Sequence, residues 1–305
     1  MECIMNRLQT SLGTLTMQNP VTVASGTYGA EFGAFYDLNC LGAYVTKTIT
    51  RYPKQGNPPP RLYETEAGLL NSIGLQNPGL DIFLSNTLPE LSAVCSAPII
   101  VSFSGSTIDE FAEMLDIMEQ EPRISGYEVN ISCPNVEKEG IAFGVDPDTV
   151  HSLTSRLAAL TSKELIIKLS PNVTDVVSIA RAAATGGATS IALINTLLGM
   201  AIDWKTGKSR IKRGVSGYSG LAIKPVALAA TYKVASALRI PVLAMGGIYD
   251  WKDALEFFYA GASAVAIGTA NFANPHAVPE LIAGLDSYLQ ERDVSLSDII
   301  GTVQF

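Results

Sequence analysis

The sequence contains little histidine, little cysteine and few charged residues. Among its 305 residues, 16% are charged, two are histidines and four are cysteines. The cysteines lie far apart and form no CxxC motif or Cys/His cluster of the kind that binds zinc or an iron-sulfur centre. They are Cys3, Cys40, Cys95 and Cys133. We therefore expect no metal site on this chain, and reduced thiols as in a cytoplasmic protein.

Long hydrophobic runs and basic patches are also missing. No apolar run reaches the ~18 to 20 residues of a membrane span, and residues 1–13 lack the basic start and apolar core of a signal peptide. A net charge of -8 without a Lys/Arg stripe argues against a nucleic-acid partner. The one basic run, residues 205–213, is either a solvated loop or part of a lid beside an anionic ligand. We expect a cytoplasmic protein that binds neither membrane nor nucleic acid.

Hydrophobic residues, at 47%, suffice for a large core. Short β-branched runs alternate with helical patterns, as in a parallel α/β sheet. The runs are 20–24, 43–46, 98–103, 126–131, 165–169, 190–194, 241–244 and 264–267, and the expected helices are 107–119, 148–160, 173–184, 223–238, 251–260 and 278–289. Eight such strands close a barrel. No linker divides the chain, so we predict the α/β fold class, with residues 1–305 forming a single (β/α)8 TIM-barrel domain.

Long connections follow the second, fourth and sixth predicted strands, at residues 48–79, 134–147 and 197–220. This position places all three insertions at the carboxyl end of the barrel, where such enzymes keep their active sites. The strands also end in residues that would form a polar ring around that mouth: Ser25, Lys47, Ser102, Asn130, Lys168, Asn195 with Thr196, Gly246 with Gly247, and Gly268 with Thr269. A single member could be a helix cap or a turn residue, but caps alone do not account for the whole ring.

Glycine-containing segments follow the last two predicted strands. AMGGI (residues 244–248) and IGTA (267–270) suit phosphate binding because glycine lets backbone N-H groups approach an anion. The pair favours a phosphorylated ligand such as FMN over ordinary tight turns. A GxGxxG dinucleotide fingerprint between a strand and a helix is absent, so we expect no Rossmann-type NAD site here.

Cys133, in the segment NISCPN, is the titratable residue best placed to remove a proton. His151 and His276 lie away from the strand ends, and we interpret both as surface residues. Cys3, Cys40 and Cys95 are interpreted as small buried apolar residues. A thiol with an ordinary pKa of about 8.5 becomes a base only as its thiolate, so activity is expected to rise toward alkaline pH.

Eight segments together resemble one family over nearly the whole chain, the FMN subunit of class 1B dihydroorotate dehydrogenases. They are ASGTYG (24–29), VTKT (45–48), NPPPRLYET (57–65), GLLNSIGLQNPG (68–79), NISCPN (130–135), GIAFGVDP (140–147), NTLLGMAID (195–203) and AMGGI (244–248). Two segments depart from the family's pattern: GVSGYSGL (214–221) stands where something closer to GGLSGPA is expected, and Phe103-Ser104 replaces smaller residues.

The resemblance implies the site residues. FMN would contact Ser25, Lys47, Thr48, Ser102, Asn130, Lys168, Ile194, Gly220, Gly246, Gly247, Gly268 and Thr269. Orotate would contact Lys47, Asn71, Ser72, Ile73, Gly74, Leu75, Asn130, Asn195 and Thr196. Asparagine amides can donate and accept along a pyrimidinedione edge, and Lys168 would stabilise the negative charge that reduction places on a flavin.

The implied reaction oxidises dihydroorotate to orotate in de novo pyrimidine (UMP) biosynthesis. Cys133 would remove the C5 proton while FMN takes the C6 hydride, and the loop after Cys133 and residues 205–217 would close over the substrate. Electrons would pass to NAD through a partner subunit carrying FAD and a 2Fe-2S cluster, in a heterotetramer built on a homodimer.

Alternatives remain open from the sequence. The nearest is a class 1A-like homodimer that uses fumarate as acceptor. A non-catalytic barrel that binds FMN or another phosphorylated ligand, with Cys133 as a packed thiol, belongs to a different class. A hydrolase with Cys133 as nucleophile lacks an evident histidine partner.

Overall fold

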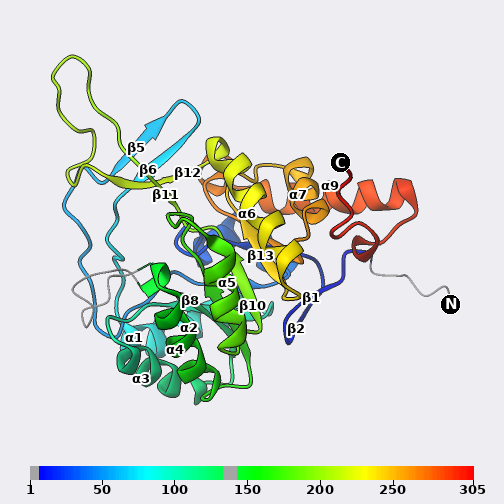
Figure 1. Ribbon diagram of the computed structural model, residues 1–305, viewed down its shortest axis with the longest axis horizontal. Helices are drawn as coiled ribbons and strands as arrows, with labels where there is room; N and C mark the ends of the chain where they lie inside the picture. Colours follow the sequence, from blue (N-terminus) through cyan, green and yellow to red (C-terminus); the bar gives the residue numbers. More distant parts are fainter. Residues whose placement is uncertain (1–6, 133–142) are drawn as a thin grey trace.

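Eight parallel strands form the centre of the molecule in the computed structural model, which describes residues 7–132 and 143–305 (Figure 1). The strands are β3 (Val21–Val23), β4 (Tyr44–Val45), β7 (Ile99–Phe103), β8 (Ile124–Asn130), β9 (Glu164–Lys168), β10 (Ser190–Leu193), β13 (Val242–Met245) and β14 (Ala264–Ile267). Their hydrogen-bonded order is β3-β14-β13-β10-β9-β8-β7-β4. The Gly42 amide donates to the Val21 carbonyl oxygen at 2.9 Å and links the two ends. The predicted TIM barrel is thus confirmed, with each strand within two residues of its expected bounds.

Helices cover the outside of the barrel at the six expected places. They are α3 (Ile108–Glu119), α4 (Pro147–Ala158), α5 (Val176–Thr185), α6 (Lys224–Ala237), α7 (Trp251–Tyr259) and α9 (Ala277–Arg292), joined by the short α1 (Leu80–Ile82), α2 (Leu88–Val94) and α8 (Ala270–Ala273). The start of α3 illustrates why they form: the Thr107 side chain accepts from the Glu110 amide and caps the helix. The apolar stripe from Phe111 to Met118 is buried against the sheet.

The amino-terminal end of the barrel is closed by a hairpin that the sequence did not reveal. Strands β1 (Thr10–Leu12) and β2 (Leu15–Met17) pair in antiparallel fashion. Leu12 and Met17 are fully buried and pack into the apolar layer inside the barrel, which includes Ile100 and Ile166. The hairpin therefore fills the end of the barrel opposite the predicted site.

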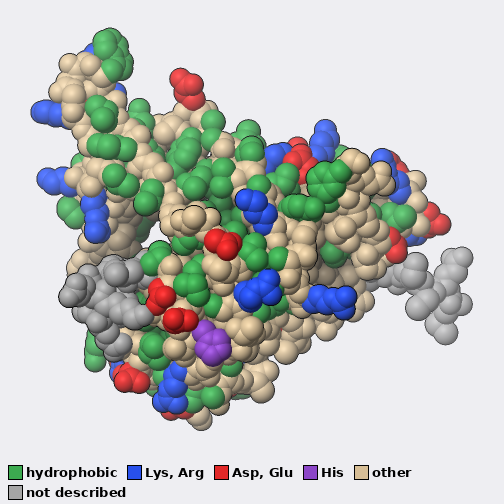
Figure 2. All heavy atoms as spheres, viewed as in Figure 1, with side chains coloured by type: hydrophobic (Ala, Val, Ile, Leu, Met, Phe, Trp, Pro, Cys, Tyr) green, Lys and Arg blue, Asp and Glu red, His purple; other side chains and the backbone are tan. Residues whose placement is uncertain are grey.

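Two of the three insertions form a sheet of their own, which we call the projecting sheet. It contains β5 (Leu62–Thr65), β6 (Gly68–Asn71), β11 (Leu197–Gly199) and β12 (Ser216–Ser219), in the order β11-β12-β6-β5. It extends beyond the barrel at the upper left of Figure 1, and Figure 2 shows Lys and Arg side chains along its outer edge. The sequence indicated these segments only as insertions, because the antiparallel pairing joins residues about 150 positions apart.

The ends of β4 and β10 lead into the projecting sheet, as expected for insertions at the carboxyl face. Residues 134–142 of the third insertion lie outside the described residues. No helix among residues 7–132 and 143–305 is long and apolar enough to span a bilayer. That residues 1–305 form a single domain stays a prediction.

Candidate active site

A cavity of about 680 Å³ opens at the carboxyl ends of the barrel strands, beneath the projecting sheet. This volume is in the range of small-molecule and cofactor sites. The predicted binding residues that line it are Ser25, Lys47, Thr48, Asn71, Ser72, Ile73, Gly74, Leu75, Asn130, Lys168, Ile194, Asn195, Thr196, Gly220, Gly246, Gly247, Gly268 and Thr269. Ser102 does not line it; this residue is fully buried below, where its hydroxyl lies 2.9 Å from the Thr48 hydroxyl. Cys133 lies outside the described residues.

The cavity is electropositive. Lys47, Lys168 and Arg213 line it, and no Asp or Glu is found among its described lining residues. Burial lowers the pKa of Lys47, and the nearby positive charge of Lys168 lowers it further. An anionic ligand beside Lys47 would relieve both effects, so the arrangement suits a phosphate or a carboxylate.

Lys168 reaches the cavity from the carboxyl end of β9. Its ammonium group donates to the Ser25 hydroxyl at 3.0 Å and lies 3.4 Å from the Glu128 carboxylate. The side chains of Lys168 and Glu128 are 5% and 0% exposed. Lys168 was predicted from the sequence as a site residue, but Glu128 was not. The sequence offered one signal for Glu128, a charged residue within an otherwise apolar strand.

Amide and hydroxyl groups gather at the ends of β8 and β10. The Asn195 side-chain amide donates to the Ser132 hydroxyl at 2.9 Å and to the Asn130 side-chain oxygen at 3.3 Å. The Ser132 backbone amide donates to that same Asn130 oxygen at 3.2 Å. Ser132 was not among the predicted binding residues, although it stands within NISCPN next to Cys133.

The loop after β6 is held in place by two asparagines that were not predicted from the sequence. The Asn57 side chain donates to the Ser72 carbonyl oxygen at 3.0 Å and to its hydroxyl at 2.9 Å. The Asn77 side chain donates to the Leu75 carbonyl oxygen at 2.6 Å. Leu75 itself has a left-handed backbone, with φ of 54°. A leucine seldom adopts this conformation unless surrounding contacts stabilise it. The hydrogen bonds from Asn57 and Asn77 provide such contacts and hold the loop against the cavity.

The ends of β13 and β14 form a glycine-lined concavity. Gly247 has φ of +79°, and a Cβ atom there would lie 2.6 Å from the Cβ of Lys224. Gly246, with φ of +123°, would place a Cβ 2.9 Å from that of Ala227. Gly268 and Thr269 face the same cavity from just before α8. Backbone of this kind after the seventh and eighth strands can surround a phosphate, and with Lys168 nearby the residues fit FMN.

Both departures from the family's pattern have structural roles. Residues 216–219 of GVSGYSGL form β12, and the Ser219 hydroxyl accepts from Thr269 at 2.8 Å. Phe103 is fully buried, with its ring against Phe111, while the Ser104 hydroxyl donates to the Asn130 carbonyl oxygen at 2.9 Å.

The basic run 205–213 was interpreted either as a solvated loop or as part of a lid beside an anionic ligand, and its residues differ in their positions. Lys205 is exposed beside Trp204, as in a solvated loop, whereas Arg213 lines the cavity. His151 and His276 are exposed, as predicted. Cys95 is buried as predicted, whereas Cys40 is only half-buried, which corrects its interpretation as a buried residue; Cys3 lies outside the described residues.

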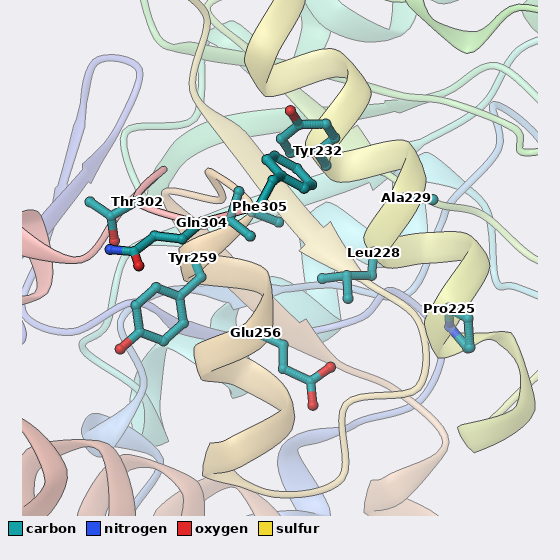
Figure 3. Close-up of a pocket in the computed structure, with 11 residues that line it drawn as sticks. Pro225, Leu228, Ala229, Tyr232, Glu256, Tyr259, Thr302, Gln304 and Phe305 are labelled. Atoms are coloured by element: carbon teal, nitrogen blue, oxygen red, sulfur yellow. The ribbon is translucent and has the colours of Figure 1, made fainter.

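A second hollow, of about 760 Å³, lies on the outer face of the barrel between α6, α7 and residues 302–305. Figure 3 shows Tyr232, Tyr259 and Phe305 around it, with Glu256 at one side. The Glu256 carboxylate forms an ion pair with the Lys224 ammonium group at 2.8 Å. The hollow contains none of the predicted site residues, so the chemistry belongs to the barrel mouth.

Comparison with known proteins identifies the family. The family model described as "Dihydroorotate dehydrogenase" matches residues 7–289. The protein named "Dihydroorotate dehydrogenase B (NAD(+)), catalytic subunit" of Thermoanaerobacter pseudethanolicus is 48% identical over 300 residues, covering 97% of this chain and 99% of the relative. Proteins of the same name from Geobacillus kaustophilus and Trichlorobacter lovleyi are 47% and 46% identical, each over 97% of this chain and 96% and 98% of the relative. The chain belongs to the dihydroorotate dehydrogenase family.

Proposed function

We propose that this chain is the FMN-containing catalytic subunit of an NAD-linked dihydroorotate dehydrogenase, oxidising dihydroorotate to orotate in de novo pyrimidine biosynthesis. The observation that carries the proposal is the cavity at the barrel mouth, where lysines, amides and a glycine-lined concavity meet. Such a site offers a positive charge for a carboxylate, hydrogen bonds for a pyrimidinedione and backbone amides for a phosphate.

FMN supplies a hydride acceptor when it is bound, and the chain's residues hold and orient it. Gly246, Gly247, Gly268 and Thr269 would surround the phosphate. Lys168 would face the pyrimidine edge of the ring system, with Ser25 fixing its ammonium group. A fixed positive charge there stabilises the electron density that the ring gains on reduction.

Dihydroorotate would bind between the flavin and the loop formed by residues 71–75. Lys47 would pair with its carboxylate, which favours the charged form that burial disfavours. Asn71, Asn130 and Asn195 would donate to its carbonyl oxygens and accept from its ring N-H groups. These contacts would hold the ring in one orientation, as transfer of the C6 hydride and removal of the C5 proton require.

Cys133 would remove the C5 proton as its thiolate. The two residues before it in the chain, Ile131 and Ser132, follow β8 directly, and Ser132 is tied to Asn195. A base attached to this point would lie beside the side-chain amides that we propose hold the substrate. Closure of the segment after Cys133 and of residues 205–217 would exclude water from the proton transfer.

Reduced FMN requires an electron acceptor. The name of these relatives specifies NAD(+) and a catalytic subunit, which supports a partner that carries the electrons onward. We propose a cytoplasmic heterotetramer of a homodimer of this chain with two partner subunits bearing FAD and a 2Fe-2S cluster. Exposed apolar side chains on and beside the projecting sheet, Leu198, Met200 and Trp204, offer surface for such assembly.

The test is an anaerobic titration of the purified chain with dihydroorotate, followed by flavin absorbance. A yellow protein that bleaches would support the half-reaction. A protein that holds FMN without bleaching would refute the substrate, and one that binds no FMN after reconstitution would refute the whole proposal. Turnover with NAD by the isolated chain would argue against the need for a partner, and turnover with fumarate would favour the alternative acceptor.

A further inference from the structure

Glu128 lies inside the barrel, one layer below the cavity. It is the third-last residue of β8, paired in register with Ser102 on one side and Ile166 on the other. Its side chain is fully buried, and one carboxylate oxygen lies 3.4 Å from the Lys168 ammonium group. The second oxygen has no hydrogen-bond partner among the described residues.

A carboxylate in this position is costly unless a positive charge compensates for it. A second fully buried glutamate of the barrel, Glu164, gives a direct comparison. Glu164 accepts from the Thr14 amide at 2.6 Å, from the Thr14 hydroxyl at 3.0 Å and from the Ser190 hydroxyl, so it joins the amino-terminal hairpin to the barrel. Within the described part of the chain, Glu128 has no such set of donors, and its charged contact is Lys168.

A carboxylate beside Lys168 is favourable because of where this lysine lies. It is almost fully buried, and Lys47, a second cation, lies close enough for the two to repel each other. Among the described residues, the titratable groups that line the cavity are Lys47, Lys168, Arg213 and Tyr249. None of these can supply a negative charge at neutral pH, and Glu128 beneath them can.

We propose that Glu128 is a positioning residue whose carboxylate holds the Lys168 ammonium group at the floor of the cavity through their buried ion pair. Glu128 therefore fixes Lys168 beside Lys47, where both ammonium groups face an anionic ligand. The identity of that ligand rests on the proposed function, but the ion pair itself does not.

The experiment measures the reactivity of the lysines directly, in the full chain freed of flavin. Acetic anhydride labels only the neutral amine, and mass spectrometry resolves Lys47 from Lys168 across a pH series. In Glu128→Gln, which keeps side-chain size, labelling of Lys168 at neutral pH should accelerate about 10-fold, because the amine has lost the carboxylate that holds it in an ion pair.

The matched control is Glu164→Gln, the same change at the second buried glutamate of the barrel. It should leave the labelling of both lysines unchanged even if it lowers the melting temperature. Labelling of Lys168 in Glu128→Gln at the wild-type rate would overturn the proposal.

A second measurement protects against a variant that does not fold. In Glu128→Asp, which keeps the carboxylate, labelling of Lys168 should stay closer to the wild-type rate than in Glu128→Gln, and equal rates in the two variants would also overturn the proposal. These measurements separate this inference from the proposed function. A chain that shows the expected labelling but binds no FMN would support the ion pair and refute the flavin assignment.

Discussion

The side chain of Asn195 donates a hydrogen bond to the hydroxyl of Ser132, with 2.9 Å between nitrogen and oxygen. This contact joins the end of β10 to the residue that precedes Cys133 in the chain. One side chain predicted to bind the substrate is therefore oriented by the segment that carries the proposed base. The Ser132 hydroxyl therefore links the proposed substrate contact directly to the segment of the proposed base, beside an indirect link through the Asn130 side-chain oxygen.

Ser132→Ala tests that coupling. Removing the hydroxyl leaves the Asn195 amide with its weaker contact to Asn130 at 3.3 Å. A hydrogen bond of this kind contributes about 0.5 to 1.5 kcal/mol, so kcat/KM for dihydroorotate should fall about 2- to 10-fold. FMN content and melting temperature serve as controls and should change little. Unchanged kcat/KM would show that Asn195 is oriented without Ser132.

The lowered pKa of Lys47 predicts that orotate binding depends on pH. Its pKa is lowered by burial and by Lys168, and a bound carboxylate would raise it again. The affinity is therefore highest below the lowered pKa and declines as the pH rises through it, because the neutral amine no longer pairs with the carboxylate. Difference spectroscopy of the flavin would measure the dissociation constant across pH. The decline should begin below the range of an ordinary lysine.

Two variants at Lys47 serve as comparisons. Lys47→Arg keeps its charge at all accessible pH values, so this decline should disappear even if affinity is lower overall. Lys47→Ala should weaken orotate binding by about 10- to 100-fold at neutral pH, the range for a hydrogen bond to a charged group. A wild-type affinity that stays constant up to the ordinary lysine range would contradict the role given to Lys47.

Replacing Gly247 by alanine should lower the free energy of unfolding, and the same change at Gly207 provides a comparison. Gly247 and Gly207 both have positive φ, at +79° and +69°. A Cβ at Gly247 would meet Lys224 at 2.6 Å, whereas nothing lies within 4 Å of one at Gly207. Gly207→Ala should cost only the left-handed backbone penalty, about 1 to 2 kcal/mol of unfolding free energy, and should leave FMN affinity unchanged. Gly247→Ala should cost more and should also weaken FMN binding. Equal effects of both variants on unfolding free energy and FMN affinity would argue against a close-packed phosphate site.

Much of the barrel could be predicted because its signals are local. Runs such as 98–103 and 165–169 are short, apolar and followed by a polar residue, and β7 and β9 lie there. The ring of strand-end residues was predictable for the same reason, since parallel strands in a barrel end at one face. Of this ring, Ser102 alone does not line the cavity, because it is fully buried below it. The sequence shows that a polar residue is near the end of a strand, but not whether its side chain reaches the cavity or stays in the layer beneath.

What escaped prediction depends on contacts between distant segments. The projecting sheet pairs Gly217 with Asn71, and neither segment has the alternating pattern that identifies a strand. Asn57, Asn77 and Ser132 act through hydrogen bonds to loop backbone or to other side chains, which composition does not reveal. Glu128 stands in an apolar run where a charge is unusual, and only its distance to Lys168 explains it.

Cys133→Ala gives the most direct test of the chemistry. The variant should retain FMN and bind orotate, because neither depends on the thiol, while the rate of flavin bleaching by dihydroorotate falls about 10²- to 10⁴-fold, the usual contribution of a general base. In the wild-type chain that rate should rise with pH as the thiolate forms, since an ordinary thiol has a pKa of about 8.5. Stopped-flow absorbance under anaerobic conditions measures both. A wild-type rate that is flat through the thiol range, or a variant that bleaches at the wild-type rate, would assign proton removal to another group.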